Sequence, residues 1–99
     1  MGYDVFFTSV EEAAQTPKMD ISYGFNAFYR YFDLPRYRGK PASDMIAPLE
    51  SGIAELKRVF HSLETTKDPL KPTPGNYSAY LTYLLSAAKA HPTWIFHCD

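Results

Sequence analysis

The sequence has little of what cross-links a small protein. Of its 99 residues one is cysteine, Cys98, so no disulfide can form within the chain. The three histidines and this cysteine show none of the usual zinc-ligand spacings, such as CxxC or HxxxH. A domain of this length can bury enough surface to be stable without such links. We therefore expect no metal and no cofactor, and a single thiol fits a reducing compartment.

Long hydrophobic runs and an excess of one charge are also missing. No stretch approaches the roughly eighteen apolar residues that a membrane span needs. The opening "MGYDVFFTSVEE" has neither the basic start nor the apolar run of a signal peptide. The formal net charge is −1, which argues against a general nucleic-acid or membrane-surface binder. We expect a cytoplasmic protein with no membrane contact, in which any basic surface is local.

Catalytic motifs are absent as well. The sequence has no GxSxG elbow, P-loop or GxGxxG. His97 and Cys98 are neighbours, but on a strand their side chains point to opposite faces. The paired acids Glu11 and Glu12 are typical of a solvated helix start. The residues therefore predict a protein that is not an enzyme and has no catalytic residue.

Aromatic residues are what the sequence has in abundance, with eight tyrosines, seven phenylalanines and one tryptophan. The hydrophobic fraction of 45% and the charged fraction of 21% are those of an ordinary globular protein. Ninety-nine residues leave no room for two independent cores. We expect one domain spanning residues 1–99.

Alternating apolar residues predict strands near both ends of the chain. Residues 3–10 are β-branched and aromatic, and residues 93–98 place Trp94, Phe96 and Cys98 on one face. Ser9, followed three residues later by an acid, predicts a short helical turn over residues 10–15. Residues 18–22 are a candidate second strand.

Helical periodicity dominates the middle of the chain. Four aromatic residues at i, i+3, i+4 and i+7 predict a helix over residues 23–33 with an aromatic core stripe. Apolar residues spaced three and four apart predict a second helix over residues 44–63. After a proline-rich connector, a third helix is expected from a cap at Asn76 or Ser78 to His91. The order predicts an α+β fold: a small two- or three-stranded sheet, containing the N- and C-terminal strands, packed against three helices.

The best candidate for function is a loop rich in arginine and tyrosine. Its prolines Pro35 and Pro41 would hold it in shape and so lower the ordering cost of binding. We call the candidate residues the basic–aromatic cluster: Arg30, Arg36, Tyr37, Arg38 and Lys40.

Arginine next to tyrosine is typical of protein-binding hot spots, and it also suits stacking on bases and pairing with phosphates. A purely structural alternative has Tyr37 packed back on the helices while the arginines stay in water. Four tyrosines off the helical stripes favour a protein interface, because tyrosine supplies contact area at low entropic cost. They are Tyr23, Tyr31, Tyr80 and Tyr83.

Three segments carry a resemblance: "YDVFF", "ISYGFNAFYRYF" and "GNYSAYLTYLLSAAKAHPTWIFHCD". Together they resemble a group of small phage and actinobacterial proteins of unknown function. The corresponding positions are Asn26, His91 and Pro92. The stretch "ISYGFN" departs from the group, where a more polar sequence is usual. The resemblance implies no activity, but it favours a mobile-element accessory protein that acts by binding.

We therefore expect a small non-catalytic protein-interaction module, in the manner of a phage protein that modulates a host complex. The alternative is a nucleic-acid-binding accessory protein that uses Arg30, Arg36, Arg38 and Lys40. A homodimer that pairs the aromatic surface with its own copy is also open.

Overall fold

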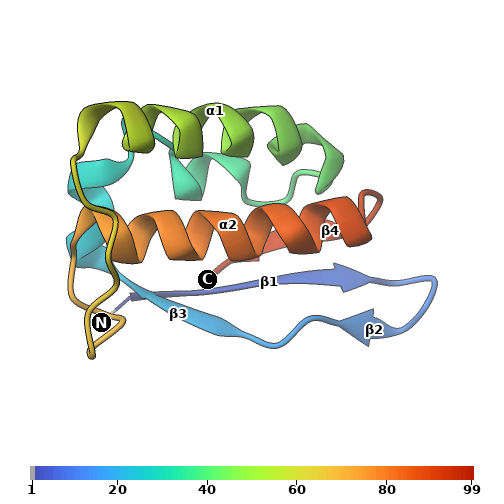
Figure 1. The fold of residues 1–99 in the computed structure, drawn as a ribbon. Coiled ribbons are helices and arrows are strands. Elements are labelled where there is room, and N and C mark those ends of the chain that lie inside the picture. The colour runs from blue at the N-terminus through green and yellow to red at the C-terminus, as the bar shows by residue number, and fades with distance from the viewer. Residues whose placement is uncertain (1) are drawn as a thin grey trace.

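The computed structural model describes residues 2–99 as one small sheet covered on one side by helices (Figure 1). The strands are β1 (Gly2–Ser9), β2 (Ala14–Gln15), β3 (Met19–Ser22) and β4 (Ile95–Cys98). Two 3₁₀ helices, η1 (Tyr23–Phe28) and η2 (Leu34–Tyr37), precede the α-helices α1 (Ser43–Val59) and α2 (Pro74–Ala90). The predicted α+β class, with paired strands near both ends of the chain, is confirmed.

Strand β1 is the centre of the antiparallel sheet. β3 and β2 pair with its first and last residues, and β4 pairs with its second half. Residues 10–13 form the turn between β1 and β2, and the nitrogen of Ala13 bonds to the oxygen of Val10 at 3.3 Å. The helical turn predicted there is therefore wrong. Ser9 does accept a bond from the nitrogen of Glu12, but the pairing of Thr8 with Gln15 turns the chain back along the sheet.

The core lies between the sheet and the helices. In Figure 1, α1 and α2 run antiparallel above the sheet, with η1 and η2 behind them. Val5 and Phe7 of β1 and Phe96 of β4 face this core and are buried. Alternation in both strands places these side chains on one face, as predicted. The other face carries Phe6, which is covered by the stacked ring of His97 and by the ammonium group of Lys18.

The predicted helix over residues 23–33 is shorter and tighter than expected. It is 3₁₀ over Tyr23–Phe28, and bonds of the i→i+3 type continue from the nitrogen of Tyr31 to the oxygen of Phe28. The carbonyl of Phe32 accepts the hydroxyl of Tyr77 in place of a helical N–H. Contacts with the long helices therefore end the segment before a full α-helix can form.

The ends of the long helices also differ from prediction. α1 stops at Val59, because Phe60 is extended and packs against the rings of Phe28 and Tyr31. α2 begins at Pro74, one turn early, and its N-cap is the side chain of Thr73. The expected cap residue Asn76 is buried instead. Its side chain bonds four groups of the proline-rich connector: the nitrogen and hydroxyl of Thr66 and the carbonyls of Asp68 and Lys71.

Asn76→Ala should lower the free energy of unfolding by about 1–3 kcal/mol, because it leaves connector groups without partners. Urea denaturation measures this effect. Asn26→Ala is the matched control, since that side chain is exposed and should change stability by less than about 0.5 kcal/mol. Equal effects of the two substitutions would contradict the role of Asn76 as the anchor of the connector.

Gly52 lets α1 approach the segment that carries the basic–aromatic cluster. A Cβ atom there would lie 2.4 Å from the carbonyl oxygen of Tyr31. Gly52→Ala should therefore destabilise the protein by about 1–3 kcal/mol, although alanine normally stabilises a helix interior. Ser51→Ala, on the exposed side of α1, should be neutral or slightly stabilising. Thermal denaturation of the two variants checks the sign, and a stabilised Gly52→Ala protein would refute the close approach.

Candidate interaction surface

The structure divides the basic–aromatic cluster into two parts. Arg30, Arg36 and Tyr37 line one hollow of about 300 Å³. Arg38 and Lys40 are not among its lining residues. We call this hollow the arginine hollow; its other lining residues are Tyr29, Tyr31, Phe32, Asp33 and Pro48. Three of the five residues expected from the sequence are therefore brought together.

Buried neighbours place the side chains of the arginine hollow. Phe32 and Leu34 are buried, so the chain is anchored on both sides of the exposed Asp33. Pro35 is the second residue of η2 and fixes the backbone of its first turn, and Arg36 is exposed in the last turn. The ring of Tyr37 stacks on Phe32 with centroids 4.8 Å apart and planes 11° apart. Tyr37 thus packs back on the core, as the structural alternative expected, and still contributes to the hollow.

The two arginines of the hollow have no ion-pair partner among residues 2–99. The ion pairs in this part of the chain join Arg58 to Glu55 and Lys89 to Glu50. The guanidinium of Arg30 instead lies 5.4 Å from the centre of the Tyr31 ring. Planar guanidinium groups match carboxylates in a two-pronged geometry. The hollow therefore offers two cations to an acidic group from outside.

The charge around the hollow is mixed rather than uniformly positive. Asp33 is part of the lining. The pKa of Glu55 is lowered, chiefly by its hydrogen bonds from Arg58 and to a smaller extent by the charges of Arg58 and Arg30. Glu55 is therefore a second acidic residue near Arg30, in addition to Asp33. The surface around the hollow therefore carries both signs of charge.

Arg38 is fastened to the sheet. Its Nε donates to the carbonyl oxygen of Cys98 at 2.7 Å, and its guanidinium lies 6.0 Å from the centre of the Tyr3 ring. Burial raises the pKa of the Cys98 thiol to about 11, and Arg38 lowers it only in part, so this thiol stays protonated at neutral pH. The side chain of Arg38 therefore has a structural role, because it links the loop to the last residue of β4.

The backbone after Arg38 runs along the outer edge of β4. The nitrogen of Gly39 donates to Phe96 at 2.8 Å, and the nitrogen of Phe96 donates to the carbonyl of Lys40 at 2.9 Å. Gly39 has φ +78°, a conformation that glycine adopts without strain. The loop is therefore held in shape by the sheet as well as by its prolines. The side chain of Lys40 itself is exposed.

The four tyrosines expected on the surface differ from one another. Tyr23 and Tyr83 are exposed at 44% and 42%. Tyr31 is half-buried against Phe60. Tyr80 is 9% exposed, and its hydroxyl donates to the carbonyl of Pro69 at 2.7 Å, so its expected exposure is wrong. The sequence could not reveal this contact, because it depends on how the connector folds back on α2.

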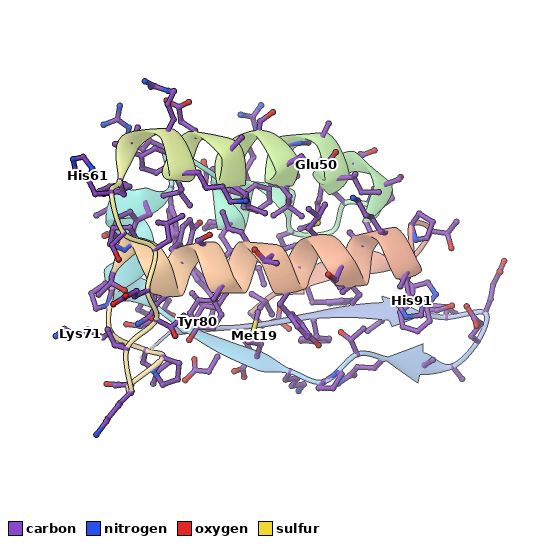
Figure 2. All side chains as sticks on the ribbon, in the orientation of Figure 1. Met19, Glu50, His61, Lys71, Tyr80 and His91 are labelled. Atoms are coloured by element: carbon purple, nitrogen blue, oxygen red, sulfur yellow. The ribbon has the colours of Figure 1, made fainter. Side chains whose placement is uncertain are left out.

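The three histidines do not cluster, and two of them, His91 and His97, have structural partners. Figure 2 shows His61 and His91 at opposite ends of the molecule. His91 stacks on Trp94, whose Nε1 donates to Glu12 at 2.9 Å. His97 shares a hydrogen bond of 2.7 Å with the hydroxyl of Thr8. Within residues 2–99, no three His, Cys, Asp or Glu side chains gather as metal ligands would.

In the same range, every helix is too short or too polar to cross a bilayer. Comparison of the chain with protein-family models, with curated proteins and with solved structures found no match.

Arg38→Met should lower the free energy of unfolding by about 1 kcal/mol, because the carbonyl of Cys98 loses its charged donor. Lys40→Met removes a neighbouring exposed cation without removing a side-chain hydrogen bond, and should leave stability unchanged within about 0.5 kcal/mol. Urea denaturation at one pH compares the two variants. If Lys40→Met costs as much as Arg38→Met, Arg38 has no special part in holding the loop.

Proposed function

We propose that the protein is a small non-catalytic protein-interaction module, and that the arginine hollow is its contact surface. The observation that carries the proposal is the pair Arg30 and Arg36, both without an ion-pair partner in the described chain, at the edge of one hollow with Tyr37. Arginine and tyrosine, together with tryptophan, are enriched in binding hot spots. The complementary group on the partner is an acidic side chain that enters between the two arginines.

Mixed charge favours a protein partner over a nucleic acid. Asp33 lines the hollow and would repel a phosphate backbone. Arg38, one of the four cations of the nucleic-acid alternative, is engaged with the carbonyl of Cys98. The whole chain carries a formal charge of −1. From the sequence resemblance we keep the proposal that the partner belongs to a host complex and that the protein is a mobile-element accessory factor.

The experiment is a pull-down from lysate of the source cells with the tagged protein, performed with and without nuclease. We expect a stoichiometric protein partner that survives nuclease. The double variant Arg30→Glu with Arg36→Glu should reduce its recovery by about tenfold or more, since loss of a charged hot-spot pair costs at least about 1.4 kcal/mol.

The matched control is Lys67→Glu with Lys71→Glu. These residues are exposed on the connector, and the change in formal charge is the same. Circular dichroism establishes that both double variants fold. Equal loss in the two would show a general charge effect and contradict the proposed surface. Loss of all captured material on nuclease treatment would favour the nucleic-acid alternative, and an empty pull-down would count against both.

A further inference from the structure

The sheet has one covered edge and one open edge. Residues 39–42 pair with β4 and cover that side of the sheet. On the other side of β1 lies β3, and within residues 2–99 no strand pairs with its outer edge (Figure 1). An open edge offers backbone N–H and C=O groups to a further strand. The outer edge of β3 is therefore the place where the sheet can be extended.

The backbone of Asp20 faces this open edge. Asp4, which lies opposite Asp20, exchanges both of its backbone hydrogen bonds with Asp99 on the other side of β1, at 3.2 and 3.0 Å. Because backbone groups alternate in direction along antiparallel strands, the N–H and C=O of Asp20 point away from β1. Lys18 lies just before β3 and has no backbone hydrogen bond within the described chain. Residues 18–20 thus carry the free backbone groups of the edge.

The side chains at this edge have opposite charges that are not used within the chain. Lys18 and Asp20 are exposed, and neither takes part in an ion pair among residues 2–99. Asp20 instead lies opposite Asp4, and like charges at opposite positions destabilise paired strands. The ammonium group of Lys18 lies 5.1 Å from the centre of the Phe6 ring, on the face of the sheet that Asp4 shares. A cation from outside, placed next to Asp20, would offset this repulsion.

Only one antiparallel register between two copies of β3 brings opposite charges together. When Met19 faces Met19 of the second copy, Lys18 of each copy faces Asp20 of the other. Moving the centre by one position, to Lys18 or to Asp20, sets like charges against each other. A register that sets Lys18 opposite Met19 fails, because the backbone groups of Met19 point inward to Val5. Charge and backbone direction therefore select the same pairing.

We propose that β3 is a homodimerisation edge, at which two copies of the chain pair antiparallel with Met19 on the two-fold axis. Backbone hydrogen bonds join Lys18 of each copy to Asp20 of the other, and the side chains form two ion pairs on the outer face of the sheet. Met19 is half-buried beside the core, and Met19 of the second copy covers it. Because the opposite edge of each sheet is already covered, the assembly closes at two copies.

Neighbouring residues keep the pairing short. Residues 16–18 oppose Phe6 and Phe7 of β1, three residues against two, and so form a bulge. Pro17 within the bulge has no N–H to donate. At the other end η1 begins at Tyr23. An edge of this length supports a weak, concentration-dependent dimer, whereas the bulge and the proline prevent open-ended strand addition.

The dimer does not depend on the proposed function. None of residues 16–22 lines the arginine hollow, so a failure of either proposal leaves the other intact.

The test is sedimentation equilibrium of the full chain at concentrations from about 10 μM to about 1 mM, the range in which a short interface dissociates. We expect a monomer–dimer equilibrium. A protein that stays monomeric throughout overturns the proposal, and larger assemblies overturn the closed two-fold arrangement.

Charge reversal tests the register. Lys18→Asp and Asp20→Lys should each raise the dissociation constant of the dimer by about tenfold or more, because each turns two opposite-charge pairs into two like-charge pairs. An equal mixture of the two variants should form a heterodimer, since one copy then brings two acids and the other brings two cations. Unchanged dimerisation of either variant alone, or no heterodimer in the mixture, overturns the register.

The matched control is Lys40→Asp. Lys40 is an exposed cation on the loop that covers the β4 edge, and the change in charge is the same as in Lys18→Asp. Its dissociation constant should stay within about twofold of the parent value. Circular dichroism establishes that all the variants fold. Equal weakening by Lys18→Asp and Lys40→Asp would show a general charge effect and overturn the proposal.

Amide hydrogen exchange identifies the paired strand. The N–H of Asp20 should exchange more slowly as the protein concentration rises, because it gains a hydrogen-bond acceptor only in the dimer. The N–H of Met19 points to Val5 within each copy and should be protected even in dilute solution. A dimer in which the exchange of Asp20 does not depend on concentration would place the interface elsewhere and overturn the proposal.

Discussion

One buried tyrosine holds the segment on which the candidate interaction surface depends. Tyr77 of α2 is fully buried, and its ring packs against Phe25 and Phe28 at 5.6 and 5.7 Å. Its hydroxyl donates to the carbonyl of Phe32, and burial raises its pKa far above the usual value. The hydroxyl is therefore protonated at neutral pH and can donate this bond within the apolar core. Residues 23–33 are thereby fixed to α2, and Arg30 and Tyr29 are fixed with them.

The loop after η2 pairs with the edge of β4, and this contact explains why Arg38 is engaged within the protein whereas Arg36 is not. A sheet edge leaves unpaired N–H and C=O groups, which soluble proteins pair or cover. Here the backbone of residues 39–42 pairs with β4, and Arg38 covers the last carbonyl of that strand. Arg30 and Arg36 lie before this contact in the chain and remain available. The same contact therefore stiffens the loop and engages Arg38, whereas Arg30 and Arg36 lie outside it.

The segment that lines the arginine hollow is anchored from two sides. Tyr77 of α2 bonds to the carbonyl of Phe32, and Gly52 lets α1 approach the carbonyl of Tyr31. The side chains of the hollow therefore lie on a fixed backbone, and the hollow needs no folding transition to form.

The sequence by itself determined the α+β class, the two long helices, the terminal strands and the residues that face the core. Those features follow from spacings of two, three and four residues, which fix the faces of strands and helices locally. Only the tertiary structure decided that residues 23–28 form a 3₁₀ helix, that the side chain of Arg38 bonds within the fold and that the ring of Tyr3 packs against that of Tyr23. The physical reason is distance along the chain: Tyr77 and Phe32 are 45 positions apart, and Arg38 and Cys98 are 60 apart. No local pattern encodes which carbonyl such a donor will reach.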